Sequence, residues 1–76
     1  MPTAPPDPFF ERRRAIGDHI RAGRRAARLT QEALAHRVGI DRPSVVEIEA
    51  GRRNMTVNTL MRIADVIGVP LSDLVR

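Results

Sequence analysis

Small and aliphatic residues recur at helical spacing in the first third of this 76-residue chain. They are separated by four, three and four residues, which places them on one stripe of an amphipathic helix. The stripe consists of Ile16, Ile20, Gly23 and Ala27. Arginines occupy the other side of this helix, at positions 21, 25 and 28. The pattern predicts a first helix from Glu11 to about Leu29.

Three more helices are predicted, each bounded by residues that commonly begin and end helices. Thr30, Asp41 and Thr56 are expected N-caps for helices over residues 31–38, 42–50 and 57–67. Glycines at 39, 51 and 68 then close these helices. The side chains expected to face inward are Leu34, Ala35, Val38, Val45, Ile48, Val57, Leu60, Ile63, Ala64 and Ile67. With a last turn over 72–76 and no strand pattern, the sequence predicts a compact all-α domain of four to five helices.

The N-terminus has a different character from the rest of the chain. It carries prolines at positions 2, 5, 6 and 8, which disfavour both helix and paired strand. We expect residues 1–10 to form a flexible arm and residues 11–76 to form the folded domain. Phe9 and Phe10 end the arm and are expected to cover the first helix. The arm is also a candidate segment for binding a protein partner.

Composition narrows the possible functions. The chain has 13 basic residues, all arginine, and 9 acidic ones, and its net charge of +4 favours a polyanionic partner. Cysteine is absent, which excludes disulfides and thiolate metal sites. His19 and His36 lie on different predicted helices without a carboxylate cluster, so we expect solvated histidines, no metal, no cofactor and no enzyme activity. No apolar run approaches a membrane span, and a cytoplasmic protein without a membrane partner is expected.

The segment from Leu29 to Asn54 carries the clearest functional pattern. Two short predicted helices are joined by a turn that begins at Gly39, which is the arrangement of a helix-turn-helix. Ala35 is small where the two helices must cross, and Ile40 can fill the space between them. The exposed side and the N-terminal end of the second helix then suit the major groove of DNA.

From Ile16 to Leu74 the chain resembles the Cro/repressor-type helix-turn-helix regulators, also called the xenobiotic-response-element family. The resemblance spans several predicted elements. It is carried by Leu29-Thr-Gln-Glu, Leu34-Ala, Val38-Gly-Ile, Ile48-Glu-x-Gly, the Arg-Arg-Asn loop, Thr56-Val-x-Thr-Leu and Ile67-Gly-Val. It implies a prokaryotic transcriptional regulator that binds double-stranded DNA as a homodimer on an inverted repeat.

The resemblance also implies roles for individual residues. The expected DNA contacts are Thr30, Gln31, Arg42, Pro43, Ser44, Val46, Glu47, Arg52, Arg53 and Asn54. Within this set, Gln31 would bind a phosphate and Arg42 a guanine or a phosphate. Val46 would meet a thymine methyl, and Glu47 would accept from cytosine or exclude other bases. Arg24 and Glu49 would form a largely buried ion pair.

The end of the chain is expected to form the dimer interface. Its apolar residues are Val69, Leu71, Leu74 and Val75. An alternative is that these residues only cap the core of the monomer, and Leu71 and Leu74 could partly do so.

The sequence also departs from the family pattern. Gly23 stands where a large aliphatic residue is usual, so Phe9, Phe10 or Met61 is expected to fill the space. Arg53-Asn54-Met55-Thr56 is similar to the controller proteins of restriction–modification systems, whereas the segment over 43–47 is not. Two alternatives therefore stay open: a controller protein, and an antitoxin or protein-interaction module that also binds DNA.

Overall fold

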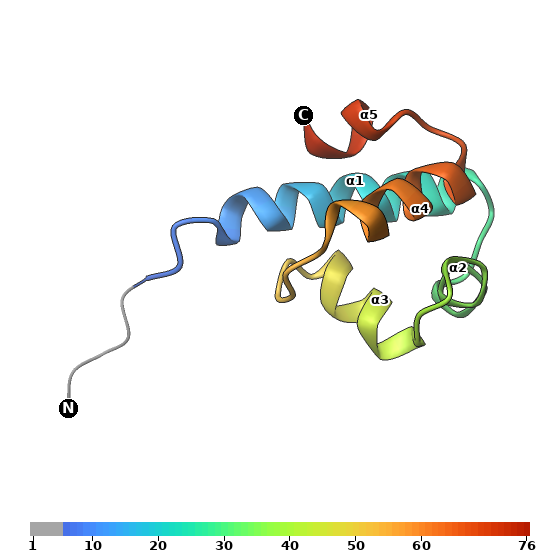
Figure 1. The fold of residues 1–76 in the computed structure, drawn as a ribbon, viewed down its shortest axis with the longest axis horizontal. Coiled ribbons are helices and arrows are strands. Elements are labelled where there is room, and N and C mark those ends of the chain that lie inside the picture. The colour runs from blue at the N-terminus through green and yellow to red at the C-terminus, as the bar shows by residue number, and fades with distance from the viewer. Residues whose placement is uncertain (1–5) are drawn as a thin grey trace.

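The computed structural model describes residues 6–76 of the chain; residues 1–5, which include part of the predicted arm, lie outside the described residues. Within that range, all the regular secondary structure is helical. They are α1 (Phe10–Ala26), α2 (Gln31–Val38), α3 (Arg42–Glu49), α4 (Val57–Ile67) and α5 (Leu71–Val75) (Figure 1). The predicted all-α fold is confirmed.

The three predicted N-caps form as expected. The Thr30 hydroxyl accepts the Ala33 N–H at 3.0 Å, the Asp41 carboxylate accepts the Ser44 N–H at 2.8 Å, and the Thr56 hydroxyl accepts the Thr59 N–H at 3.0 Å. Each satisfies one of the N–H groups that a helix start leaves without a partner. Hydrogen bonds from the side chain and the backbone of Ser44 hold the pKa of Asp41 below its usual value.

Helix α1 differs from its predicted bounds at both ends. It begins at Phe10, inside the predicted arm, and it ends at Ala26 instead of near Leu29. Arg28 closes it in the left-handed conformation, with φ of 59°, while the Leu29 N–H donates to the Arg24 carbonyl at 3.0 Å. This closure usually uses glycine, and a side chain there costs roughly 1–2 kcal/mol. Ala27 consequently lies outside the helix and is exposed, contrary to the predicted stripe.

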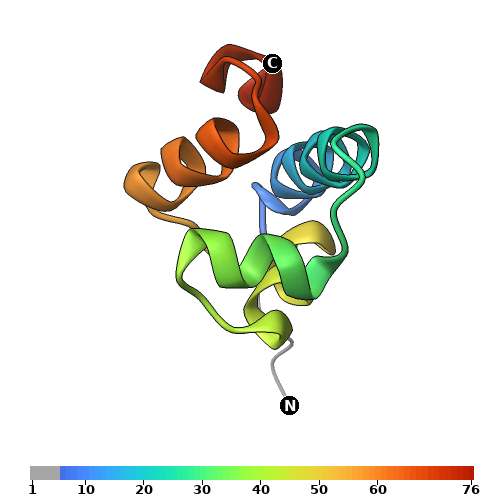
Figure 2. The same ribbon diagram turned by 90° about the vertical axis from the view of Figure 1, so that its right-hand side faces the viewer.

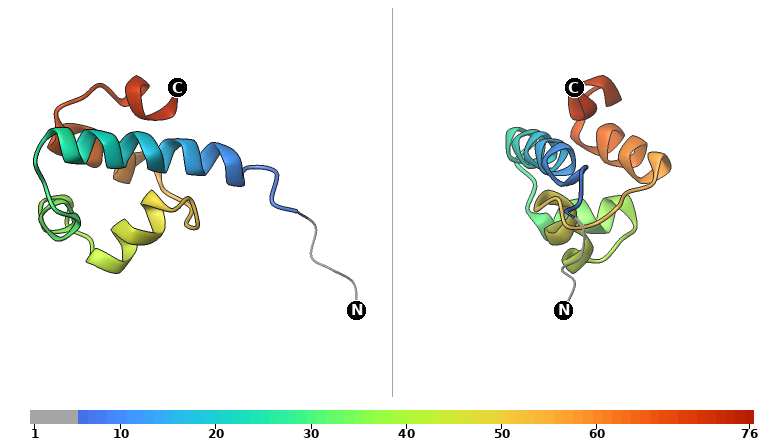
Figure 3. Two further views of the ribbon diagram at one scale, coloured as in Figure 1. Left: turned by 180° about the vertical axis from the view of Figure 1, so that it is seen from behind. Right: turned by 90° about the vertical axis from the view of Figure 1, so that its left-hand side faces the viewer.

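The helices pack in three layers around a single core. In Figure 2, α1 and α4 lie side by side in the middle, α5 covers one side of them, and α2 with α3 covers the other. Figure 3 shows from behind how α1 runs the length of the domain. Each helix contributes one hydrophobic side chain that is only 0–1% exposed: Ile20, Leu34, Val45, Ile63 and Leu74. The five helices thus share one hydrophobic centre.

Two further predictions about packing are wrong. Val57 is 61% exposed, because it lies in the first turn of α4, beyond the reach of the core. The space beside Gly23 is filled by Ile67, whose Cδ1 lies 2.6 Å from where a Cβ on Gly23 would stand. Of the three residues expected there, Phe9 and Met61 are exposed and Phe10 is half-buried. The Phe9 ring instead lies under the Arg12 guanidinium, at 5.9 Å.

None of the helices within residues 6–76 combines the length and the apolar character that a membrane crossing requires.

Candidate nucleic-acid interface

Helices α2 and α3 form a helix-turn-helix. Figure 1 views α2 almost along its axis, with α3 on the same side of α1. Gly39 ends α2 with φ of 86°, and the Ile40 N–H donates to the Ala35 carbonyl at 3.0 Å. Ala35 is buried and Ile40 half-buried, so the short turn is packed against the core. The angle between the two helices is therefore fixed by buried contacts.

The N-terminal end of α3 protrudes from the domain. Val45 and Ile48 are buried beneath the helix, whereas Asp41, Arg42 and Pro43 are exposed. Val46 and Glu47 are half-buried, at the edge of the same free face. A helix N-terminus carries partial positive charge, which suits an approach to phosphates and to acceptor groups in the major groove.

Ser44 occupies a different position from the one expected of an exposed recognition residue. It is buried, and its hydroxyl accepts a hydrogen bond from Nη1 of Arg53. Its side chain therefore points toward the loop that follows α3. Ser44 is placed to hold Arg53 beside the start of the helix, a role that the sequence pattern did not suggest.

The loop after α3 is basic and open to solvent. Arg52, Arg53 and Asn54 are all exposed. Nη1 of Arg52 lies 3.8 Å from Oε1 of Glu47, and both side chains are well solvated, so the pair contributes little to stability. It nevertheless places the Glu47 carboxylate next to the loop, close to a cation that could otherwise bind phosphate.

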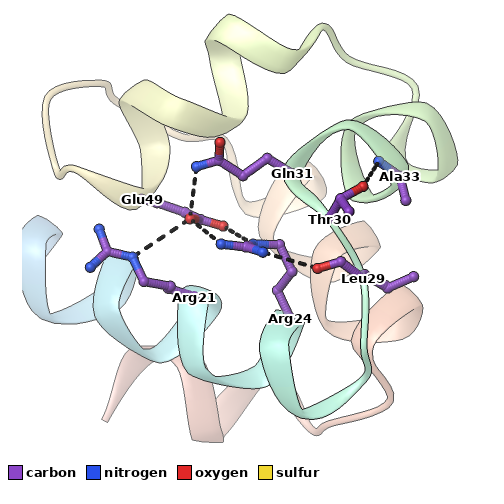
Figure 4. A network of polar contacts seen from close by, with 7 residues as sticks. All are labelled: Arg21, Arg24, Leu29, Thr30, Gln31, Ala33 and Glu49. Carbon is purple, nitrogen blue, oxygen red and sulfur yellow. Dashed lines mark hydrogen bonds and ion pairs between the residues drawn. The ribbon is translucent and has the colours of Figure 1, made fainter.

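A buried ion pair joins α1 to the end of α3 (Figure 4). Arg24 donates from Nε to Oε2 of Glu49 at 2.7 Å and from Nη2 to Oε1 at 3.1 Å. Arg24 also donates from Nη1 to the carbonyl of Leu29 at 2.9 Å. Glu49 is only 1% exposed, so these donors replace the water that its carboxylate loses.

Two further side chains reach the same carboxylate. Nε2 of Gln31 donates to Oε1 of Glu49 at 3.2 Å, and Nε of Arg21 lies 3.7 Å from that oxygen (Figure 4). Sequence reasoning assigned Gln31 to a phosphate and gave Arg21 no role. Glu49 thus connects the start of α2, the end of α3 and the middle of α1. One hydrogen of the Gln31 amide remains available for a phosphate.

Two glycines bring the backbone of α1 against the end of α3. A Cβ on Gly17 would lie 2.7 Å from the carbonyl oxygen of Ile48 and closer still to that of Glu49. A Cβ on Gly51 would lie 2.7 Å from the Cα of Arg14. Sequence reasoning did not single out Gly17, although a glycine inside a helix is costly and often marks a close approach of two backbones.

The segment before α1 is tied to the same region. Nε of Arg13 donates to the Gly51 carbonyl at 3.0 Å, and its guanidinium also pairs with Asp7. The hydrogen bond from Arg13, together with one from the Phe9 N–H, lowers the pKa of Asp7. Residues just before α1 are therefore linked to the loop that follows α3.

The four residues predicted to form a dimer interface differ in their exposure. Leu74 is part of the core of the monomer, contrary to that assignment, and Val69 and Leu71 are half-buried. Val75 is 48% exposed.

Nδ1 of His19 lies 3.1 Å from the Leu74 carbonyl, so this histidine helps to dock α5 on α1 and is not simply solvated. Because a carbonyl can only accept, Nδ1 carries the proton.

A family model described as helix-turn-helix matches residues 20–74. An uncharacterized helix-turn-helix-type transcriptional regulator of Sinorhizobium fredii is 37% identical over 66 residues, which cover 87% of this chain and 86% of that protein. The immunity repressor of Bacillus phage phi105 is 33% identical over 60 residues, covering 79% of this chain and 42% of the repressor.

The solved structures that resemble this fold are also those of regulatory proteins. The restriction–modification controller protein C.AhdI of Aeromonas hydrophila superposes with a TM-score of 0.83 and 28% identity, covering 90% of this chain and 99% of that one. The clp gene regulator ClgR of Corynebacterium glutamicum gives a TM-score of 0.80 and 25% identity, covering 91% and 71%. The family is one of DNA-binding regulators and not of enzymes. The chain belongs to the helix-turn-helix family, in the Cro/repressor type that its sequence resembles, and is a DNA-binding transcriptional regulator.

Proposed function

We propose that this regulator binds an inverted-repeat operator as a homodimer, with the N-terminal end of α3 in the major groove of each half-site. The observation that carries the proposal is the exposure of Arg42 at the protruding start of α3, beside a solvated basic loop. Helices of this kind read base edges with their first residues, while the neighbouring loops bind phosphates.

Two groups of residues would position the domain on the DNA backbone. The first is the start of α2, where the capped N-terminus and the free amide hydrogen of Gln31 favour a phosphate. The second is the loop of Arg52, Arg53 and Asn54. These contacts carry no sequence information, but they fix the register of α3 in the groove.

Base recognition would fall to side chains on α3. Arg42 can donate to the acceptors of a guanine, and Val46 can contact a thymine methyl. Glu47 would accept from a cytosine amino group or repel other bases. Because Arg52 lies beside Glu47, binding would exchange part of this ion pair for contacts with DNA.

Substitutions of a residue that contacts bases and of a residue that contacts the DNA backbone should have different effects on binding. Arg42→Ala should relax the preference at particular base pairs, by about 1–3 kcal/mol each. Arg53→Ala should weaken binding to all sequences about equally and flatten the salt dependence, whose log–log slope is roughly −0.9 per neutralised phosphate. Selection of bound DNA from a random pool, followed by titrations at several salt concentrations, measures both effects. A slope near zero for the native protein would contradict the proposal.

Dimerisation would use the exposed apolar side of the C-terminal segment. Val75 is the most exposed of the four predicted interface residues, and it adjoins half-buried Leu71 on α5. A two-fold pairing here would place the recognition helices about 34 Å apart, one turn of DNA. It would also add buried area that a chain of this size lacks.

The variant Val75→Asp should therefore dissociate the dimer without unfolding the monomer. Light scattering would show the loss of the dimer, and thermal unfolding would check the fold. Leu74→Asp is unsuitable because it places a charge in the core. A native protein that stays monomeric at tens of micromolar and binds a half-site as tightly as the repeat would rule the dimer out.

A controller role in a restriction–modification system is a second candidate. The structural likeness to C.AhdI favours it, as does the similarity of Arg53-Asn54-Met55-Thr56 to such proteins. The proposal predicts that the selected DNA sequence lies upstream of neighbouring endonuclease and methyltransferase genes. A genomic neighbourhood without either gene would remove it.

A further inference from the structure

A hollow of about 400 Å³ lies between the first half of α1 and the end of α5. Figure 3 shows the end of α5 lying over this part of α1. The residues that line the hollow are Arg12, Ala15, Ile16, Val75 and Arg76. Three of them are apolar, while one arginine belongs to α1 and the other follows α5. Pockets of roughly 300–1,000 Å³ hold small ligands, so this hollow can receive an aromatic ring.

An exposed aromatic side chain lies beside the hollow. Phe9 is 56% exposed, although phenylalanine is among the residues most often buried. The guanidinium carbon of Arg12, which lines the hollow, lies 5.9 Å from the centre of the Phe9 ring. The backbone of Phe9 is also fixed, because its N–H donates to Oδ1 of Asp7 at 2.9 Å and its carbonyl accepts the Arg13 N–H at 2.9 Å. A side chain held in place in this way loses little conformational freedom when a partner covers it.

A projecting ring and a hollow on the same face can pair with a second copy of that face. In a two-fold dimer each surface meets the same surface of the partner, so residue i contacts residue j and j contacts i. The Phe9 ring of one protomer would fill the hollow of the other, and the reverse contact would form by symmetry. Both features lie next to Arg12, so one symmetry axis can bring both pairs together.

The charges around the two features are complementary. Glu11 is exposed two residues after Phe9, and Arg12 and Arg76 border the hollow. Among residues 6–76, none of these three side chains forms an ion pair within its own chain. Insertion of Phe9 into the hollow of a partner would carry Glu11 toward the partner's arginines. Opposite charges at the rim of an interface favour the correct orientation of the two partners.

The C-terminal segment alone offers little area for a dimer. A stable interface buries about 800 Å² on each partner. Helix α5 has five residues, Leu74 is buried in the core and Leu71 is already half-buried. A buried aromatic side chain contributes roughly 150–250 Å², so Phe9 and the first half of α1 would supply much of the missing surface.

We infer that the start of α1 belongs to the dimer interface, and that Phe9 of each protomer inserts into the hollow between α1 and α5 of its partner. The inference rests on the proposed dimerisation through the C-terminal segment, because Val75 belongs both to that interface and to the hollow. Sequence reasoning expected Phe9 to cover α1 of its own chain. Aromatic residues are enriched at the centres of interfaces, and an exposed ring beside an apolar hollow fits that use.

The first test compares two truncations of exposed apolar side chains. Phe9→Ala should raise the Kd of the dimer by about tenfold or more, because the two-fold axis removes both rings at once. Phe9→Leu keeps an apolar side chain and should restore most of the affinity. Met61→Ala truncates an exposed side chain of α4 that does not line the hollow, and its Kd should stay near the native value. Analytical ultracentrifugation measures each Kd, and thermal unfolding checks that the variants remain folded.

A second test asks which surfaces meet. The chain has no cysteine, so introduced cysteines can form disulfides only with one another. Phe9→Cys and Ala15→Cys are made in separate chains, one of which carries a tag, and the two proteins are mixed and oxidised. The mixed disulfide between tagged and untagged chains should form faster than that between Phe9→Cys and Met61→Cys. Equal rates would contradict insertion of Phe9 into the hollow.

The combined results separate the inference from the proposed function. If Val75→Asp dissociates the native dimer while Phe9→Ala and Met61→Ala leave it unchanged, the inference is overturned and the C-terminal dimer stands. If the native protein is monomeric at tens of micromolar, both fall. If Phe9→Ala weakens the dimer but the mixed disulfide with Ala15→Cys does not form preferentially, Phe9 contacts another part of the partner, and its insertion into the hollow is overturned.

Discussion

Replacing Arg24 with methionine is expected to lower the free energy of unfolding by about 3–5 kcal/mol, measured by urea denaturation. The change would leave the Glu49 carboxylate in the core with Gln31 at 3.2 Å and the distant Arg21 as its remaining partners. Methionine keeps much of the volume, so the decrease in stability reports the uncompensated charge. Small domains have stabilities of roughly 5 kcal/mol, and the variant should be partly unfolded at room temperature.

A matched control separates the buried pair from general loss of positive charge. Arg21→Met removes a cation that is near the same carboxylate but solvated, and its expected effect is at most about 1 kcal/mol. The double variant Arg24→Met with Glu49→Leu should be more stable than Arg24→Met, since no charge is left buried. Equal decreases for Arg24→Met and Arg21→Met would contradict the role given to the buried pair.

Replacing Gly17 with alanine is expected to cost about 3 kcal/mol, although alanine is the better helix former. The added Cβ would stand 2.7 Å from the Ile48 carbonyl oxygen, and backbone cannot move aside as a side chain can. To relieve the clash, α1 must move away from the end of α3. Chemical denaturation measures the decrease in stability, and weaker operator binding should accompany the displacement of α3.

Gly23→Ala is the matched control within the same helix. Its Cβ would meet only Cδ1 of Ile67, the end of a flexible side chain that can rotate. The gain in helix propensity, about 1 kcal/mol, should offset most of the repacking. The expected change is therefore small. If the two alanine variants are destabilised to a similar extent, the close contact of α1 with α3 is not what requires glycine at position 17.

The helix boundaries could be read from the sequence wherever a local interaction sets them. Thr30, Asp41 and Thr56 cap helices through bonds to residues three positions away, and Gly39 and Gly68 end helices by their own backbone freedom. The end of α1 could not be read in this way. Arg28 takes the left-handed conformation that arginine disfavours, so no residue type marks the boundary.

The candidate site was predictable in part. The sequence pattern placed Arg42 and the basic loop at the surface, because burial of Val45 and Ile48 leaves the opposite side of α3 free. It did not predict the burial of Ser44, whose direction depends on a contact with Arg53 in the next loop. Nor did it decide between the core and the dimer interface for Leu74, since helical spacing alone cannot show which end of a small domain covers the core.

The sequence by itself determined the number and order of the helices, the turn between α2 and α3, and the basic character of the surface, because periodicity, caps and composition act over short distances along the chain. The family resemblance predicts the Arg24–Glu49 pair, and only the tertiary structure decided the other contacts among α1, α2 and α3. Arg24 and Glu49 are 25 residues apart, and Gly17 touches the end of α3 from a helix that begins far earlier in the chain. Such contacts exist only after the chain has folded, when burial removes water from Glu49 and excludes a Cβ at Gly17.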